Sequence, residues 1–279
     1  LGFNEIEKPL ALQVGGSDKN ELSEVCKIAE DMGYDEININ LGCPSKRVQK
    51  NKFGACLIKE PDLVAQCINK MINSCKIPIT AKTRIGFDDT ENYNHLNSFI
   101  NKISEAGCKT IILHARKAIL KGLTPKENLK IPKLNYPLVY EIKKTNKNLE
   151  IIINGGITNT DQIIKHLKNC DGVMIGRAIY QNPYFLAEIE NKIFDNNKVL
   201  SRTDVAEKLV EYVQEEAKKG TRVNQIMRHA VGLYHGQNGA NKWKRYLSDN
   251  MMARDSDFQK VNHIMTIAQN NEKANQTAS

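Results

Sequence analysis

The stretch EIIINGGITNTDQIIKHLKNCDGVMIGRAI, residues 150–179, decides the fold. It contains two short apolar runs, Glu150–Asn154 and Gly172–Gly176, and the helical pattern Asp161–Leu167 lies between them. A strand, a crossover helix and a second strand form the unit from which parallel sheets are built. The stretch therefore predicts a βαβ unit.

The same alternation continues toward the amino terminus. Four further apolar runs begin roughly 20–40 residues apart, a spacing typical of a (β/α) barrel. These runs are Leu10–Val14, Glu36–Leu41, Ile77–Ile85 and Thr110–His114, and the helical patterns between them are Asn20–Met32, Pro61–Ser74 and Tyr93–Ala106. A closed barrel of this type has eight strands. We therefore expect an α/β TIM-type barrel with six of the eight strands in this chain.

The strand signal stops after about Asp195. Four helical patterns follow, Asp204–Lys218, Asn224–Tyr234, Lys242–Asp249 and Asp257–Gln269, and a polar tail begins at Asn270. We therefore predict a barrel domain over residues 1–194, a small all-α domain over residues 195–269 and a tail over residues 270–279.

The composition is that of a globular protein, with 41% hydrophobic residues, 26% charged residues and a formal charge of +8. The sequence contains no run of the roughly 18–20 apolar residues that are needed to span a membrane. The seven cysteines show neither a CxxC spacing nor a cluster with histidines. We therefore expect reduced thiols in a cytosolic compartment, no disulfide framework and no metal site.

Two segments that follow strands are strongly basic. Cys43–Lys59 and Cys108–Lys126 each contain five basic residues and no acidic residue. Active sites of parallel barrels form on the loops at the carboxyl ends of the strands. These segments are therefore either a solvated basic rim or a mouth that accepts a large polyanion.

Other residues near strand ends predict an anion site. Lys82 and Arg84 share one face of their strand, and buried cations require carboxylate partners or a bound anion. Gly155 and Gly156 follow one of the last two strands and Arg177 follows the other, where TIM barrels often bind phosphate. The alternative for these two loops is that they form tight turns only.

Cys43 immediately follows a strand, so it faces the mouth and is either a chemical or a structural residue. We expect the other six cysteines to be small core residues. His114 ends a strand and either contacts a ligand or is structural. We expect structural roles for the histidines within helical patterns, which are His95, His166 and His263.

The predicted helical domain has its own basic segment. No acidic residue lies between Glu216 and Asp249, whereas seven basic residues lie there, and Tyr234, Trp243 and Tyr246 are interleaved with them. Basic groups neutralise phosphates and aromatic rings stack on bases, so this pattern favours RNA binding. The alternative is a solvated helical face.

Five motifs, in order along the chain, resemble those of the tRNA-dihydrouridine synthases: NLGCPSKRVQKNKFGACL, KTRIGFDD, HARKAILKGLTPKEN, NGGI and DGVMIGRAIYQNP. The resemblance extends from about Pro9 to Asp249 and is strongest to the bacterial branch that acts at positions 20 and 20a of the tRNA D-loop. It implies an FMN-binding barrel and a helical tRNA-binding domain. It also implies that NADPH reduces the flavin, which passes hydride to carbon 6 of a flipped uracil. The sequence does not indicate the oligomeric state, and we take a monomer as the default expectation.

The resemblance assigns roles to individual residues. Cys43 matches the cysteine that protonates carbon 5 of the uracil, and Asn40 matches the residue that holds the base. The residues that match FMN contacts are Gln13, Lys82, His114, Asn154, Gly155, Gly156, Gly176 and Arg177. Those expected to contact tRNA are Arg84, Arg116, Lys126, Lys242 and Arg245.

The sequence also differs from the family pattern. The family has a strand that ends in Ala-Pro-Met upstream of the position of Gln13, and no counterpart occurs here, so we expect the first two barrel strands to be absent. Leu129 and Asn241 stand where the family has arginines, which bears on the choice of uridine. Two alternatives stay open: an FMN barrel that acts on a free pyrimidine, like dihydroorotate dehydrogenase, or a truncated, non-catalytic RNA-binding fragment.

Overall fold

The computed structural model describes residues 2–251, which fall into two compact units. The first unit contains the chain up to Ile157 together with Ile163–Met174, and the second contains Thr158–Gln162 and the chain from Ile175 onward. The predicted domain boundary at residues 194/195 falls inside the second unit. The predicted helix Asp257–Gln269, the tail from Asn270 and His263 lie outside the described residues.

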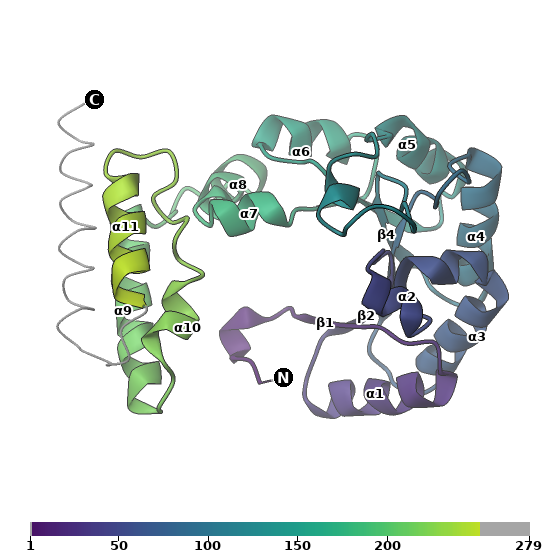
Figure 1. The fold of residues 1–279 in the computed structure, drawn as a ribbon, viewed down its shortest axis with the longest axis horizontal. Coiled ribbons are helices and arrows are strands. Elements are labelled where there is room, and N and C mark those ends of the chain that lie inside the picture. Colours follow the sequence, from purple (N-terminus) through teal and green to yellow (C-terminus); the bar gives the residue numbers. More distant parts are fainter. Residues whose placement is uncertain (1, 252–279) are drawn as a thin grey trace. The chain divides into compact units, whose positions relative to one another are not determined.

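The first unit is built on a parallel six-stranded sheet whose strand order follows the chain (Figure 1). The strands are β1 (Ala11–Val14), β2 (Glu36–Leu41), β3 (Ile79–Arg84), β4 (Thr110–His114), β5 (Glu150–Asn154) and β6 (Gly172–Met174). All five neighbouring pairs are parallel. The predicted six-stranded, TIM-barrel-type α/β fold is confirmed.

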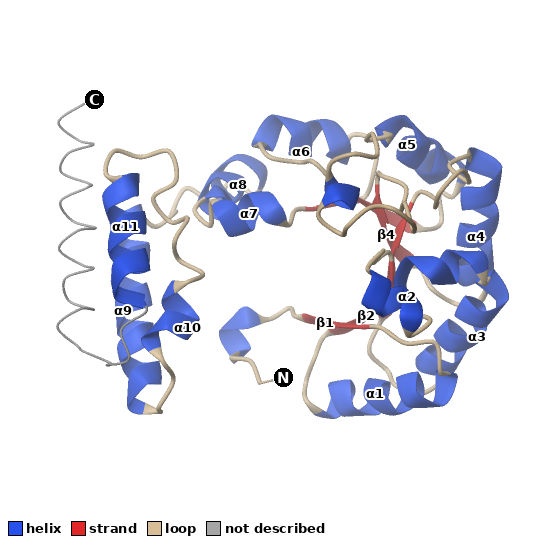
Figure 2. Cartoon of the chain, in the orientation of Figure 1, coloured by secondary structure: helices blue, strands red, loops and turns tan. Residues whose placement is uncertain are grey.

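Helices follow the strands and lie outside the sheet (Figure 2). They are α1 (Lys19–Asp31), α3 (Pro61–Ile72), α4 (Tyr93–Glu105), α5 (Tyr136–Thr145) and α6 (Thr160–Leu167), with the short α2 (Lys46–Lys50) and the 3-10 turns η1 (Glu5–Glu7), η2 (Gly54–Lys59) and η3 (Glu127–Leu129). Side-chain oxygens of Asp18, Asn92 and Asn135 cap α1, α4 and α5 by accepting amide hydrogen bonds of the first turn.

The two faces of the sheet differ in character because successive strand residues point to opposite sides. One face is fully buried and, apart from Thr83, apolar. It carries Ile37, Ile39, Leu41, Ala81, Thr83, Ile111, Leu113, Ile151 and Ile153. The helices contribute apolar side chains such as Leu22, Ile68 and Ile100 to the same core. The other face of the sheet is mostly polar, and it positions the candidate site.

The second unit is helical in its described part. Its helices are α7 (Arg177–Gln181), α8 (Phe185–Ile193), α9 (Arg202–Lys218), α10 (Val223–Met227) and α11 (Ala240–Met251). Trp243 and Tyr234 are buried in the core of this unit, with ring centroids 4.9 Å apart, and the Trp243 indole N–H donates to the Ala230 carbonyl at 3.0 Å. The prediction that these two rings stack on bases is therefore wrong.

Among residues 2–251, no helix is both long and apolar enough to cross a bilayer. The same part of the chain contains no group of three or more His, Cys, Asp or Glu side chains placed to hold a metal ion.

Candidate active site

A row of polar side chains crosses the sheet of the first unit. The strand register pairs Gln13 with Asn38, Asn40 with Lys82, and His114 with Asn154. Paired residues of parallel strands point to the same face, so one face carries five predicted site residues from five strands: Gln13, Asn40, Lys82, His114 and Asn154.

Hydrogen bonds connect the amides at the β1 end of this row. The Gln13 side-chain amide donates to Asn38 Oδ1 at 2.8 Å and accepts from Asn40 Nδ2 at 3.1 Å. Asn38 in turn donates to Thr80 Oγ1 at 2.7 Å, and both residues are buried. Sequence reasoning missed Asn38, although the alternation EININL places it on the same face as Asn40.

Lys82 occupies the middle of the row. Its ammonium donates to Asn154 Oδ1 at 3.2 Å, and Asn154 donates to the Met174 carbonyl at 2.8 Å. Burial, assisted by the nearby charge of Arg84, lowers the pKa of Lys82 to about 8. None of the salt bridges between described residues includes Lys82. This side chain is therefore a desolvated cation that an anionic group would stabilise.

Arg84 has a different environment from the one expected. Its side chain is only 3% exposed, and burial lowers its pKa to about 10. Its guanidinium donates to the carbonyls of Gly42 at 2.9 Å, Lys117 at 3.0 Å and Asn128 at 3.1 Å. The partners of the Arg84 guanidinium are therefore peptide carbonyls, and not the carboxylates or bound anion that we expected. The tRNA contact of Arg84 stays a prediction.

Cys43 lies in the loop after β2 and is half-buried. Asn40 Oδ1 accepts the amide hydrogens of Gly42 and Cys43, both at 3.0 Å, and thereby folds the start of this loop back on its strand. The expectation that the other cysteines are core residues is confirmed for Cys26, Cys67, Cys108 and Cys170, which are buried. Cys56 and Cys75 are only partly buried.

The loop after β4, residues 115–130, is organised by one residue that sequence reasoning missed. Asn128 is fully buried, with Oδ1 accepting the Ile119 amide at 2.7 Å and Nδ2 donating to the carbonyls of Ile119 at 3.0 Å and Thr124 at 3.3 Å. The guanidinium of Arg116 donates to the carbonyls of Lys130 and Pro132, and Lys126 is exposed. We refer to residues 115–130 as the basic loop.

Gly155 and Gly156 form the turn after β5, with φ angles of +116° and +72°. A Cβ on Gly155 would lie 2.5 Å from His114 Cδ2, and one on Gly156 would lie 2.6 Å from Leu134 Cδ1. The Tyr136 hydroxyl donates to the Gly155 carbonyl at 2.7 Å. Packing within the protein thus already requires both glycines, and the approach of a phosphate to them stays a prediction.

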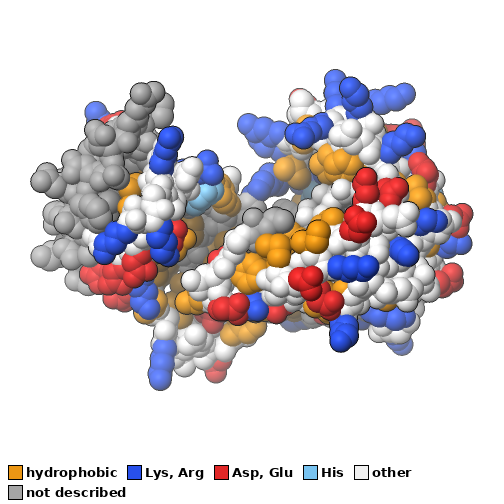
Figure 3. Space-filling view, turned by 90° about the horizontal axis from the view of Figure 1, so that it is seen from below, with side chains coloured by type: hydrophobic (Ala, Val, Ile, Leu, Met, Phe, Trp, Pro, Cys, Tyr) orange, Lys and Arg blue, Asp and Glu red, His pale blue; other side chains and the backbone are white. Residues whose placement is uncertain are grey.

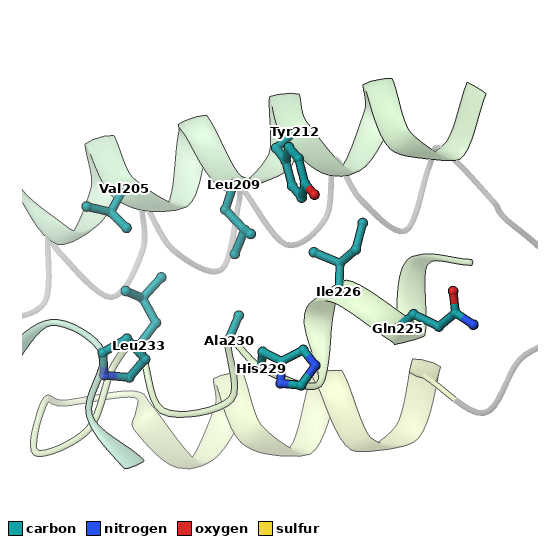
Figure 4. A pocket seen from close by; sticks show the side chains of 9 residues that line it. Val205, Leu209, Tyr212, Gln225, Ile226, His229, Ala230 and Leu233 are labelled. Atoms are coloured by element: carbon teal, nitrogen blue, oxygen red, sulfur yellow. The ribbon is translucent and has the colours of Figure 1, made fainter. Parts of the chain in front are cut away.

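The remaining predicted residues belong to the second unit. Gly176, Arg177, Lys242 and Arg245 are exposed, and Arg245 lies 3.6 Å from Asp249 in an exposed ion pair. On the face drawn in Figure 3, acidic and basic side chains of the first unit are interspersed. A pocket of about 440 Å³ in the second unit is mainly apolar, and none of the predicted site residues lines it (Figure 4).

Comparison with known proteins gives consistent results along nearly the whole chain. The sequence model of the dihydrouridine synthase (Dus) family matches residues 2–271. The tRNA-dihydrouridine(20/20a) synthase of Shewanella oneidensis is 49% identical over 251 residues, which cover 90% of this chain and 75% of that protein. The protein of the same name from Synechocystis is 49% identical over 253 residues, covering 90% and 76%, and that of Escherichia coli O6:H1 is 45% identical over 269 residues, covering 96% and 81%.

Proposed function

Because this chain belongs to the dihydrouridine synthase family, we propose that it reduces uridines of tRNA to 5,6-dihydrouridine, with positions 20 and 20a of the D-loop as its targets. The relatives named for this reaction support the proposal through their 45–49% identity and their coverage of at least 90% of the chain. FMN is the proposed cofactor and NADPH the proposed reductant.

The observation that carries the proposal is the polar row of the sheet with Lys82 at its centre. Lys82 is a desolvated ammonium that donates to the neutral amide of Asn154. A flavin with negative charge on its pyrimidine side would complement this ammonium, and the amide of Gln13 offers a donor and an acceptor for the ring edge. When bound, FMN supplies the hydride that reduces carbon 6 of the uracil.

Cys43 is the proposed proton donor to carbon 5 of the uracil. A general acid acts only when it carries its proton and lies within hydrogen-bond reach of the accepting atom. The two amide hydrogen bonds to Asn40 Oδ1 fix the backbone that carries this thiol at the carboxyl end of β2. Asn40 would therefore have two roles: it would hold the uracil base, as the family implies, and it would position Cys43.

The other family-matched residues complete the proposal. His114 would contact the flavin, and the FMN phosphate would be held by Asn154, Gly155, Gly156, Gly176 and Arg177. The tRNA would be contacted by Arg116, Lys126, Lys242 and Arg245. The three carbonyl partners of Arg84 favour a role for this side chain in holding loops together rather than in direct contact with tRNA.

The test is a comparison of Cys43→Ala with the wild-type protein and with Cys75→Ala as a matched control. We expect all three proteins to bind FMN and to accept electrons from NADPH. Oxidation of the reduced flavin by unmodified tRNA should slow about 10²–10⁴-fold only in Cys43→Ala, the range typical of a lost general acid. Dihydrouridine formation at the wild-type rate by Cys43→Ala would refute the role of Cys43, and a wild-type protein that neither binds FMN nor modifies tRNA would refute the function.

A further inference from the structure

We infer that Gln49 and Arg84 are positioning residues for Cys43, because they fasten the peptide on both sides of this cysteine to the basic loop. The inference deepens the proposed function and rests on Cys43 as the proton donor. It also identifies the basic loop as the part of the barrel whose position sets that of the thiol.

The carbonyls on either side of Cys43 each accept a side-chain hydrogen bond. The carbonyl of Gly42, directly before the cysteine, accepts from Arg84 Nε at 2.9 Å. The carbonyl of Pro44, directly after it, accepts from Gln49 Nε2 at 2.8 Å. The peptide that carries the thiol is therefore held at both ends.

Both side chains also donate to the basic loop. Arg84 Nη1 bonds to the carbonyls of Lys117 at 3.0 Å and Asn128 at 3.1 Å, and Gln49 Nε2 bonds to the carbonyl of Leu120 at 2.9 Å. Gln49 lies in α2, 71 residues before Leu120, so it joins two distant segments of the chain. The two side chains thus connect the Cys43 loop to the basic loop.

Further hydrogen bonds hold the basic loop in place. The Leu120 amide donates to Asp88 Oδ1 at 2.9 Å, and the Asp88 amide donates to the Ala118 carbonyl at 2.7 Å. Asn128 fixes the middle and the end of the loop through Ile119 and Thr124. A displacement of this loop would consequently be transmitted to the backbone of Cys43 rather than absorbed within the loop.

This connection has a chemical consequence for the proposed reaction. A misplacement of about 1 Å can slow an enzymatic step by on the order of 10²-fold. The basic residues of the basic loop are Arg116, Lys117, Lys121, Lys126 and Lys130. A polyanion that binds against this loop therefore acts on the same backbone that sets the position of the proton donor.

The test replaces Gln49 with methionine, which keeps the length of the side chain, adds no charge and removes both hydrogen bonds. Gln66→Met on the exposed side of α3 is the matched control. Hydrogen exchange is measured at the amides of Cys43 and Ala55, the latter of which donates to the Cys43 carbonyl at 2.9 Å. We expect exchange there to become about 10- to 30-fold faster in Gln49→Met, as the loss of two hydrogen bonds predicts, and to stay unchanged in Gln66→Met.

A second measurement separates positioning from general loosening. In Gln49→Met the tRNA-dependent oxidation of the reduced flavin should slow about 10- to 100-fold, with a larger solvent deuterium isotope effect, while FMN affinity and reduction by NADPH stay at wild-type values. Asn128→Ala tests the same connection from the side of the basic loop. In the described chain the Asn128 side chain bonds only within this loop, and the substitution should nevertheless speed hydrogen exchange at the Cys43 amide.

Wild-type exchange rates at Cys43 in both variants would overturn the inference, as would an equal loss of FMN affinity and tRNA-dependent oxidation in Gln49→Met. If Cys43→Ala oxidises the reduced flavin with tRNA at the wild-type rate, the role of Cys43 fails, and the catalytic part of the inference fails with it. If the wild-type protein neither binds FMN nor modifies tRNA, the proposed function fails as well. The exchange measurement needs no flavin and therefore still reports whether the two loops are connected.

Discussion

The substitution Asn128→Ala is a demanding test of how the basic loop is held. The Asn128 side chain is fully buried and makes three hydrogen bonds, at 2.7 Å and 3.0 Å to Ile119 and at 3.3 Å to Thr124. Alanine removes all three bonds and leaves the amide and the carbonyl of Ile119 without this partner.

The expected magnitude follows from these bonds. A typical hydrogen bond contributes about 1 kcal/mol, and a buried polar group that loses its partner costs about 1–3 kcal/mol. The two shorter bonds dominate, because the bond to Thr124 is long, so we expect the free energy of opening of the loop to fall by about 3 kcal/mol. That change corresponds to an increase of roughly 10²-fold in the open population.

The assay is native-state hydrogen exchange at the Ile119 amide, with urea unfolding followed by far-ultraviolet circular dichroism as the global measurement. Asn94→Ala on the exposed side of α4 is the control, and we expect it to change stability by less than about 0.5 kcal/mol. If exchange at Ile119 in Asn128→Ala stays within about twofold of the wild-type rate, the assignment of Asn128 as the residue that holds this loop is refuted.

Three further changes test other parts of the structure. Gly155→Ala should lower stability by at least about 2 kcal/mol, because a Cβ would lie 2.5 Å from His114 Cδ2 at a φ of +116°; thermal unfolding checks this. Trp243→Phe should cost about 1–3 kcal/mol by leaving the Ala230 carbonyl without its indole donor, and unchanged urea unfolding would contradict it. Lys82→Met should stabilise the flavin-free protein by about 3 kcal/mol at pH 7, since burial lowers the Lys82 pKa from 10.5 to about 8. Lys82 binds its proton more tightly in the unfolded state than in the folded state. The cost of burying the charged lysine is therefore fully present below about pH 8 and is lost as the pH rises toward 10.5. The gain in free energy of unfolding of Lys82→Met, measured by urea unfolding, should shrink over that range.

The strands could be predicted well because each one is a short apolar run. The predicted runs Glu36–Leu41, Thr110–His114 and Glu150–Asn154 coincide with β2, β4 and β5. The helix α5 was missed, although Asn135 before it and Pro137 at its start form a recognisable amino-terminal signal. The short helices α2 and α7 span barely more than one turn, which is too short for a periodic pattern to appear.

The site residues that lie on strands could be predicted, because alternation along a strand tells which face each side chain is on. The site residues that act through contacts between loops could not be predicted. Lys82 and Asn154 share a face because of the register of parallel strands, which alternation within each strand already indicates. The roles of Gln49 and Asn128 depend on which loops meet in space, and no local pattern reports that. Trp243 was misassigned because basic neighbours suggested a surface, whereas its spacing of four residues from Leu247 is that of a buried helical stripe.

The strands lie in the sheet in the same order as along the chain, and this has a consequence for how the first unit folds during synthesis. Each of the strands from β2 to β6 pairs with the strand made just before it, so each pairing closes a loop of only one strand–helix unit. The entropic cost of closure rises with the logarithm of loop length, and short closures therefore keep contact order low. Each new strand can add to the sheet as it leaves the ribosome, without waiting for the carboxyl-terminal helices. Among the described strands β1 pairs only with β2, so the outer edge of β1 and the growing edge are the parts of the nascent sheet that can meet wrong partners.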